Sequence, residues 1–83
     1  MYYVYVLKSV RVSRFYVGYC SDLRKRVAEH NNGVTKSTKG FTPWKLIYYE
    51  AYTEKQLATK REKQLKNHAA KADLLVRLGY EAG

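Results

Sequence analysis

Five residues of this chain carry side chains suited to chemistry on a phosphate ester: Tyr5, Tyr16, Arg26, His30 and Glu62. An arginine presents a fork of donors that matches phosphate oxygens. A histidine exchanges a proton near neutral pH, and a carboxylate can hold Mg²⁺ together with water and a substrate phosphate. Chemistry on a phosphodiester is expected if the fold brings these groups together.

The two tyrosines lie in segments that predict neighbouring strands. Residues 2–8 and 15–20 are rich in β-branched and aromatic side chains, and the short polar connection between them favours an antiparallel hairpin. Side chains alternate along a strand, so Tyr5, Tyr16 and Gly18 share a face if the register allows it. A glycine inside a strand often marks a close approach by a ligand or another backbone. Each tyrosine taken singly is better explained as an ordinary strand residue, since the chain contains nine.

Arg26 and His30 lie one turn apart on a predicted helix that a residue at 21 or 22 can cap and that Gly33 ends. Both flank the apolar stripe of Leu23 and Val27, so we expect them at the border between core and solvent, where a cleft can form. The other interpretation of His30 is an ordinary helix-end residue that interacts with the terminal carbonyls.

Glu62 lies at the margin of the apolar arc of a second predicted helix. This arc consists of Leu57, Ala58, Leu65 and Ala69. A carboxylate at that margin could hold one Mg²⁺ ion. On spacing alone, a surface ion pair with Lys66 at i+4 explains Glu62 slightly better.

The remaining elements complete an α+β pattern. Residues 44–52 predict a third strand, and Thr53 with Gln56 forms a capping box that opens the second helix, which runs to about Asn67. Residues 70–78 predict a last helix, ended by Gly79. The order β-β-α-β-α-α predicts a small three-stranded antiparallel sheet flanked by helices.

Taken in order, these residues resemble the motifs of the GIY-YIG nuclease family, most of all its small single-domain bacterial members. The motifs stand here as Val4-Tyr5-Val6, Tyr16-Val17-Gly18, Arg26 with His30, and Ala58-x-x-x-Glu62-x-x-Leu65-Lys66. Val4 replaces the glycine of the first motif, and Tyr19 replaces a lysine that often follows the second. Asn67 is the candidate for an asparagine found late in several members. The resemblance implies one domain over residues 1–83, with the motif-bearing core at 2–67 and a C-terminal helix at 68–79.

The resemblance also implies hydrolysis of a phosphodiester by in-line attack of water. Glu62 would hold one Mg²⁺ or Mn²⁺ ion, and Arg26 would offset charge that develops in the transition state. Tyr5, with His30, would orient or deprotonate the water, and Tyr16 would hydrogen-bond the phosphate or the water. The ordinary pKa of tyrosine is about 10, so a base role for Tyr5 needs the metal or Arg26 to lower it.

The charge of the chain independently indicates a polyanionic partner. Sixteen Lys and Arg against seven Asp and Glu give a formal net charge of +9. Nucleic acid is the expected partner, DNA ahead of RNA, and no membrane partner is expected, because no helix combines basic residues with a wide apolar face. Phe41 and Trp44 lie among basic residues and could stack on bases, although a core position suits Trp44 better. The expected nucleic-acid contacts are Lys36, Lys39, Arg61, Lys63 and Lys66.

Cysteine usage and hydropathy indicate a cytoplasmic protein. The single cysteine, Cys20, cannot form an internal disulfide, and with only His30 and His68 beside it no zinc site is expected. No segment resembles a signal peptide or approaches the roughly 18 apolar residues of a membrane span. The oligomeric state stays open.

The sequence therefore favours a metal-dependent endonuclease that acts on DNA, with structured or branched DNA among its candidate substrates. The alternative is a non-catalytic nucleic-acid-binding module of the same fold, and a protein-docking domain ranks third. A nuclease requires Glu62 for metal-dependent cutting, whereas a binding module binds in a salt-sensitive manner without it.

Overall fold

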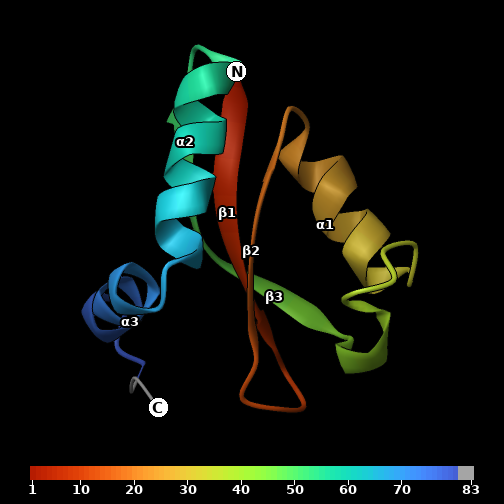
Figure 1. Cartoon of the computed structure of the whole chain (residues 1–83). Coiled ribbons are helices and arrows are strands. Elements are labelled where there is room, and N and C mark those ends of the chain that lie inside the picture. The colour runs from red at the N-terminus through yellow and green to blue at the C-terminus, as the bar shows by residue number, and fades with distance from the viewer. Residues whose placement is uncertain (81–83) are drawn as a thin grey trace.

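A computed structural model describes residues 1–80, which form three strands and three α-helices in the order β-β-α-β-α-α, so the predicted α+β class is confirmed (Figure 1). The elements are β1 (Tyr2–Ser9), β2 (Phe15–Cys20), α1 (Leu23–Asn31), the short 3-10 helix η1 (Lys39–Phe41), β3 (Trp44–Tyr52), α2 (Lys55–Lys66) and α3 (His68–Arg77).

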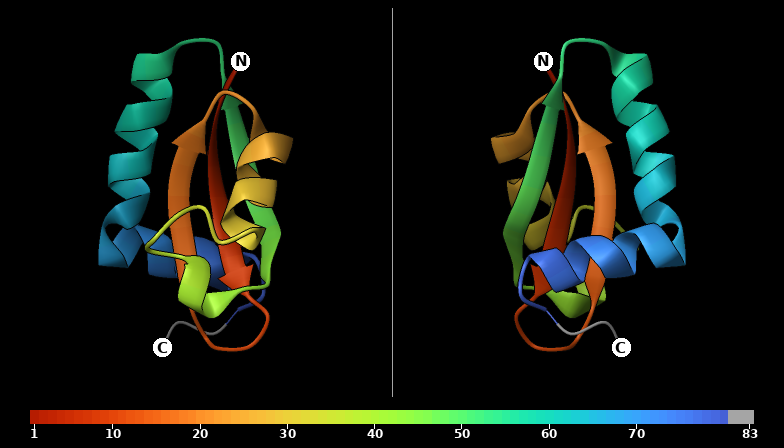
Figure 2. Two further views of the ribbon diagram at one scale, coloured as in Figure 1. Left: turned by 90° about the vertical axis from the view of Figure 1, so that its right-hand side faces the viewer. Right: turned by 90° about the vertical axis from the view of Figure 1, so that its left-hand side faces the viewer.

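The three strands form one antiparallel sheet in the order β2-β1-β3, and helices cover both of its faces. In Figures 1 and 2, α1 lies on one face, and α2 with α3 lies on the other. Side chains of β1 alternate between two hydrophobic clusters: Val4 and Val6 pack beneath α2 and α3, whereas Tyr5 and Leu7 pack with Trp44 on the α1 side. The central strand is therefore buried on both faces.

Tyr5 lies directly opposite Gly18 in the register of β1 and β2, and Tyr16 is its diagonal neighbour on the same face. A Cβ atom added to Gly18 would lie 2.5 Å from the Tyr5 hydroxyl and 2.7 Å from Cζ. A group does approach Gly18 closely, but it is the side-chain ring of Tyr5 and not the ligand or second backbone that the sequence predicted.

The first helix begins and ends as the sequence predicts. Asp22 is the N-cap residue, and its side chain accepts a hydrogen bond from the amide of Lys25 at 3.1 Å. Beyond the helix, Gly33 has a φ of 75°, the left-handed conformation that glycine adopts without strain.

The predicted capping box at the second helix is wrong. β3 continues to Tyr52, and Glu54, still extended at φ −123° and ψ 139°, is the N-cap residue without a side-chain cap. Gln56 is thus the second helical residue instead of the third, so it cannot pair with Thr53 as a capping box requires. Leu57 is also 46% exposed, contrary to its expected place in the apolar arc, while Ala58 and Leu65 are buried.

The last helix begins at His68, two residues before the helical pattern found at 70–78, because Asn67 caps it. The Asn67 side-chain oxygen accepts hydrogen bonds from the amides of Ala69 and Ala70 at 3.0 and 3.4 Å. Ala69 therefore belongs to α3 and not to the arc of α2. Gly79, with a φ of 90°, follows the helix as expected.

A pair of hydrogen bonds joins the end of α1 to the start of β3. The Asn31 side chain donates to the carbonyl of Trp44 and accepts from its amide. The indole of Trp44 is buried, as the sequence suggested, and its N–H donates to the carbonyl of Thr38 at 2.9 Å. These contacts hold the loop between α1 and β3 against the α1 face of the sheet.

Glu50 joins β3 to α2. Its carboxylate accepts hydrogen bonds from the hydroxyls of Tyr48 and Tyr52 and from Nε of Arg61 at 2.9 Å. Burial by itself raises the pKa of Glu50, but the hydrogen bonds from Arg61 and the two tyrosines outweigh burial, so the pKa is lowered overall. Arg61 is accordingly engaged within the fold.

Replacement of Glu50 should give a pH-dependent loss of stability. Because the pKa of Glu50 is lowered in the folded state, its stabilising contribution is present above the ordinary value of 4.5 and is lost as the pH falls through the folded-state pKa. Glu50→Gln should lower the free energy of unfolding by about 1–3 kcal/mol at neutral pH, and the deficit should shrink in acid. Urea unfolding across this pH range measures it. Asp73→Asn, which removes an exposed ion pair with Arg77, is the control and should change little.

Adding a methyl group at Gly18 should also destabilise the fold. Gly18→Ala puts a carbon in the space of the buried Tyr5 ring, and overpacking of this kind costs about 1–3 kcal/mol. Gly40→Ala is the matched control, since no atom lies within 4 Å of its added carbon. Equal urea midpoints for the two variants would contradict the contact between Tyr5 and Gly18.

Candidate active site

Tyr5, Tyr16 and His30 form a cluster between β1, β2 and α1. The Tyr5 hydroxyl lies 2.8 Å from Nε2 of His30. The ring centroid of Tyr16 lies 4.9 Å from that of His30 and 6.3 Å from that of Tyr5. The structure thus brings together three of the five residues singled out in the sequence.

His30 is completely buried, so its predicted place at the border of core and solvent is wrong. The helix projection gave its direction correctly, but the loop that follows α1 folds over it. Nδ1 of His30 lies 2.8 Å from the hydroxyl of Thr38 in that loop, and Thr38 is itself fully buried. Both ring nitrogens are therefore engaged with hydroxyl groups.

Arg26, the fourth of these residues, is the charged group of the cluster that reaches solvent. Its side chain is 34% exposed and forms an ion pair with Glu29 at 3.1 Å. The neighbouring Tyr5 hydroxyl is the main cause that raises the pKa of Arg26, and Glu29 contributes in the same direction. A permanent positive charge therefore stands beside the Tyr5 hydroxyl.

Burial governs the protonation of the cluster. It raises the pKa of Tyr5 to about 12, and the opposing influence of Arg26 is smaller. A phenolate base would need a lowered pKa. The protein by itself does not lower the pKa of Tyr5. Burial, and then the charge of Arg26, lower the pKa of His30. At neutral pH the cluster holds a neutral phenol against a neutral imidazole, which is the better proton acceptor of the two.

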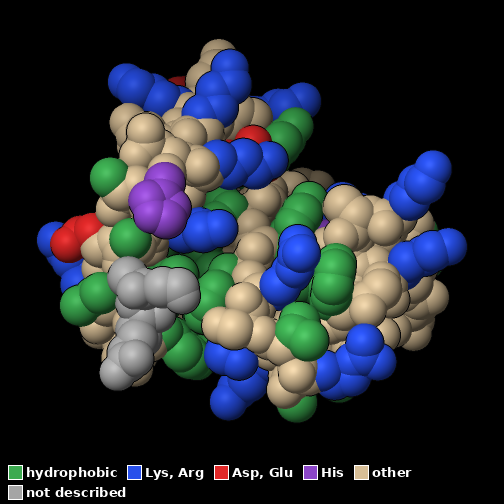
Figure 3. Space-filling view, turned by 60° about the horizontal axis from the view of Figure 1, so that its bottom comes forward, with side chains coloured by type: hydrophobic (Ala, Val, Ile, Leu, Met, Phe, Trp, Pro, Cys, Tyr) green, Lys and Arg blue, Asp and Glu red, His purple; other side chains and the backbone are tan. Residues whose placement is uncertain are grey.

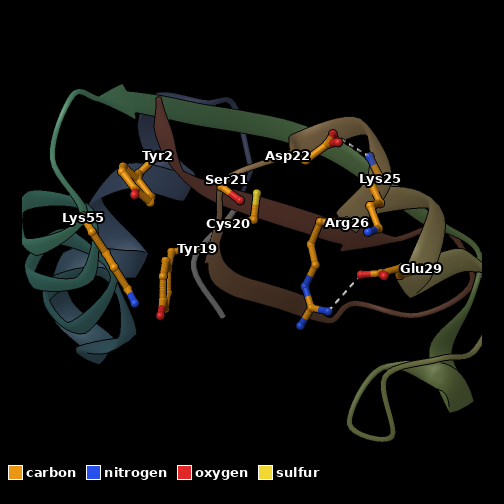
Figure 4. A pocket seen from close by; sticks show the side chains of 9 residues that line it. All are labelled: Tyr2, Tyr19, Cys20, Ser21, Asp22, Lys25, Arg26, Glu29 and Lys55. Carbon is orange, nitrogen blue, oxygen red and sulfur yellow. Dashed lines mark hydrogen bonds and ion pairs between the residues drawn. The ribbon is translucent and has the colours of Figure 1, made fainter.

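An open pocket of about 610 Å³ lies beside the cluster, at the end of β2. Figure 4 shows Tyr19 and Lys55 on one side of it and Arg26 with Glu29 on the other. Its lining comes from β1, β2, α1, α2 and the turn between β2 and α1: Tyr2, Tyr19, Cys20, Ser21, Asp22, Lys25, Arg26, Glu29 and Lys55. Three cations face two carboxylates here, so the lining has a net positive charge that suits an anionic ligand.

Glu62 lies apart from this pocket lining. It is on α2 between the buried residues Ala58 and Leu65, on the helix that packs against the other face of the sheet, and its side chain is 16% exposed. Its carboxylate pairs with Nζ of Lys66 at 3.2 Å, the ion pair that the sequence offered as the simpler explanation.

The donor set at Glu62 fits one kind of metal. Within residues 1–80, no three His, Cys, Asp or Glu side chains lie close enough together to cage an ion. Mg²⁺ commonly binds one or two carboxylates and completes its shell with water and substrate phosphate, whereas a structural zinc ion requires four protein ligands. The Glu62 carboxylate therefore suits Mg²⁺ or Mn²⁺ bound jointly with a substrate.

The basic side chains predicted to contact nucleic acid differ in their availability. Lys36, Lys39 and Lys63 are exposed, whereas Arg61 is bound to Glu50 and Lys66 to Glu62. The face in Figure 3 carries many more Lys and Arg side chains than Asp and Glu. Within residues 1–80, no helix is long and apolar enough to span a bilayer.

The structure gives little support to stacking of Phe41 and Trp44 on bases. Trp44 is buried, and the guanidinium of Arg14 lies over the ring of Phe41 at 4.4 Å.

Sequence reasoning missed two groups at this site. Lys25 lines the pocket next to Arg26, although the sequence did not single it out as a site residue. Thr38 gave no signal at all, since it is one of several Ser and Thr residues in an irregular loop. Only the burial of its hydroxyl against His30 distinguishes it.

Comparison with known proteins agrees with this geometry. Residues 1–74 match the family described as the GIY-YIG catalytic domain. A UPF0213 protein of Staphylococcus epidermidis is 40% identical over 74 residues, which cover 88% of this chain and 89% of the relative. A UPF0213 protein of Natronomonas pharaonis is 40% identical over 77 residues, with 90% and 89% covered.

A solved structure shares the fold. The UPF0213 protein of Bacillus halodurans, determined by solution NMR, aligns with a TM-score of 0.56 and 32% identity over 94% of this chain and 85% of that one. The matched family is of the nuclease type, which implies a nucleic acid as substrate and a divalent metal as the usual cofactor. With its four motifs in order and its sheet and helices in the matching arrangement, this chain belongs to the GIY-YIG family.

Proposed function

We propose that this protein is a metal-dependent endonuclease that hydrolyses a phosphodiester of DNA, with structured or branched DNA among its substrates. The observation that carries the proposal is the hydrogen bond between the Tyr5 hydroxyl and Nε2 of His30, 2.8 Å long, next to the guanidinium of Arg26. It joins a proton-accepting pair to a fixed positive charge at the edge of a pocket, the combination that attack of water on a phosphodiester requires.

Tyr5 and His30 activate the water together. Tyr5 is completely buried before substrate binds, so this step requires the attacking water to reach its oxygen. The water then transfers a proton to the Tyr5 oxygen while the Tyr5 hydroxyl proton moves to Nε2 of His30, so the imidazole holds the proton at the end of the step. This route avoids a free phenolate, which the pKa of about 12 for Tyr5 makes unfavourable at neutral pH. Tyr16, whose ring packs on His30, orients the phosphate or the water through its hydroxyl.

Arg26 binds the phosphate and stabilises the charge that develops on its oxygens. Its exposed guanidinium can exchange the carboxylate of Glu29 for a phosphate at little cost, since exposed ion pairs contribute little free energy. Lys25 and Lys55, in the same pocket lining, add positive charge for the neighbouring phosphates.

Glu62 would hold the divalent ion, Mg²⁺ or Mn²⁺, in place of its ion pair with Lys66. When bound, such an ion would supply positive charge that offsets the charge developing on the phosphate and leaving oxygens. The single carboxylate at this position means that affinity for the ion depends on the substrate phosphate as well.

A cleavage assay tests the proposal. Purified protein with Mg²⁺ or Mn²⁺ should cut at least one of labelled duplex, flap, branched or single-stranded DNA, and an RNA substrate tests the choice of nucleic acid. Arg26→Ala should reduce the cutting rate by about 10²- to 10³-fold, and Glu62→Gln should remove metal-dependent cutting. Asp73→Asn, a substitution on α3 that removes an exposed ion pair, is the control and should cut like the wild type.

Binding without cutting would support the alternative function. If no substrate is cut and all three variants still bind DNA as tightly as the wild type, the protein is a nucleic-acid-binding module and the catalytic proposal is wrong.

Binding itself should depend on salt through the exposed lysines of the loop after α1. Each phosphate contact contributes about −0.9 to the slope of log K against log salt concentration. If Lys36 and Lys39 each contact a phosphate, the double variant Lys36→Ala, Lys39→Ala should reduce the magnitude of that slope by about 2. Fluorescence anisotropy with labelled DNA at several salt concentrations measures it. Arg77→Ala, whose guanidinium pairs with Asp73, should leave the slope unchanged, and an unchanged slope in the lysine variant would exclude this loop from the interface.

A further inference from the structure

Thr38 is a buried polar residue that the proposed reaction does not use directly. Its hydroxyl lies 2.8 Å from Nδ1 of His30 and 3.3 Å from the carbonyl of Thr35. Its own carbonyl accepts the indole N–H of the buried Trp44 at 2.9 Å. Thr38 is therefore fixed through its backbone and its side chain, although it belongs to an irregular loop.

The donors and acceptors around His30 determine which of its ring nitrogens carries the proton. The hydroxyl of Thr38 has one proton, and the carbonyl of Thr35 can only accept. When that proton goes to Thr35, Nδ1 of His30 must donate to Thr38, and the neutral ring then has an unprotonated Nε2. Tyr5 donates to this Nε2, so every donor from Tyr5 to Thr38 has an acceptor.

The other tautomer satisfies fewer groups. With the proton on Nε2, His30 would donate to Tyr5, and the hydroxyl of Thr38 would turn from Thr35 to Nδ1. The proton of Tyr5 would then need a new acceptor, and its charged neighbour Arg26 has only donors. Only the first arrangement therefore gives each of the three protons an acceptor among the groups that contact it.

We propose that Thr38 is a positioning residue of this site: its hydroxyl holds the proton of His30 on Nδ1 and so keeps Nε2 free to accept the proton of Tyr5. The consequence for catalysis rests on the proposed nuclease function, but the tautomer itself does not. When the Tyr5 proton reaches Nε2, the ring becomes an imidazolium whose Nδ1–H stays bonded to Thr38. The hydroxyl thus supports both the neutral and the protonated ring.

The tautomer can be measured without substrate or metal. The chain has two histidines, and His68 is exposed, so it serves as an internal reference. In protein labelled with ¹⁵N in histidine, two-dimensional NMR of the ring nitrogens at neutral pH should show His30 with a protonated Nδ1 and an unprotonated Nε2. A proton on Nε2 in the wild type overturns the proposal.

Variants at Thr38 test the cause. Thr38→Val keeps the shape but removes the hydroxyl, and it should shift His30 toward the Nε2–H tautomer, while Thr38→Ser should retain the wild-type signals. Thr42→Val, in the same loop, removes a half-buried hydroxyl that is not one of the two hydroxyl partners of the His30 ring nitrogens, and it should change nothing. If Thr38→Val does not fold, Thr38→Ala makes the same test with a smaller side chain. An unchanged tautomer in a folded variant without the hydroxyl overturns the proposal.

Cleavage rates extend the test to function. Thr38→Val should lower kcat by at least about 10-fold with little change in KM, and Thr38→Ser should restore most of it, because a histidine in the wrong tautomer binds substrate but cannot accept the proton. Loss through KM alone, or equal kcat for Val and Ser, contradicts the positioning role. If the wild type cuts no substrate, the nuclease proposal fails while the NMR result still decides the role of Thr38.

Discussion

The ring of Tyr5 lies across Gly18, and this contact places a polar group in the middle of an apolar sheet. The central strand is buried on both faces, so a hydroxyl there must find a partner inside the protein. With no side chain at position 18, the ring fits against β2 and its hydroxyl meets His30. His30 in turn needs a partner for its second nitrogen, which Thr38 supplies. One missing side chain therefore leads to a buried polar chain across three elements.

The same burial separates proton transfer, by Tyr5 and His30, from phosphate binding by Arg26. Tyr5 and His30 are both completely buried before any substrate binds, so their mutual hydrogen bond is stronger than it would be in solvent. Arg26 stands at the opening of the pocket, where a charged group keeps its hydration until a phosphate replaces it. The lowered pKa of His30 reflects this arrangement, since burial and the charge of Arg26 both oppose its protonation.

How much of this the sequence predicted depends on the range of each interaction. Alternation along two strands brings Tyr5, Tyr16 and Gly18 onto one face, and the spacing of Arg26 and His30 follows from the helical repeat, so these relations could be derived from local periodicity. The burial of His30 could not, because it depends on a loop that a pair of hydrogen bonds from Asn31 to Trp44 holds in place. The contact between Thr38 and His30 could not be derived either, because it depends on the position of the same loop. The capping box failed for a local reason, since one extended residue moved the start of α2.

The position of Glu62 could not be predicted from the sequence, and it indicates how the site is completed. A helical projection gives directions around one axis but not the face of the sheet that the helix covers, and α2 lies on the face opposite Tyr5. The pocket at the end of β2 nevertheless draws residues from both α1 and α2. Before any substrate binds, Arg26 is paired with Glu29 and Glu62 with Lys66, so each charge is neutralised within its own helix. A phosphate and a divalent cation would exchange these partners, giving Arg26 and Lys66 the anion and Glu62 the cation. In the proposed reaction the substrate and its metal therefore supply the link between the two helices, and the charges that perform the chemistry stay satisfied locally until both arrive.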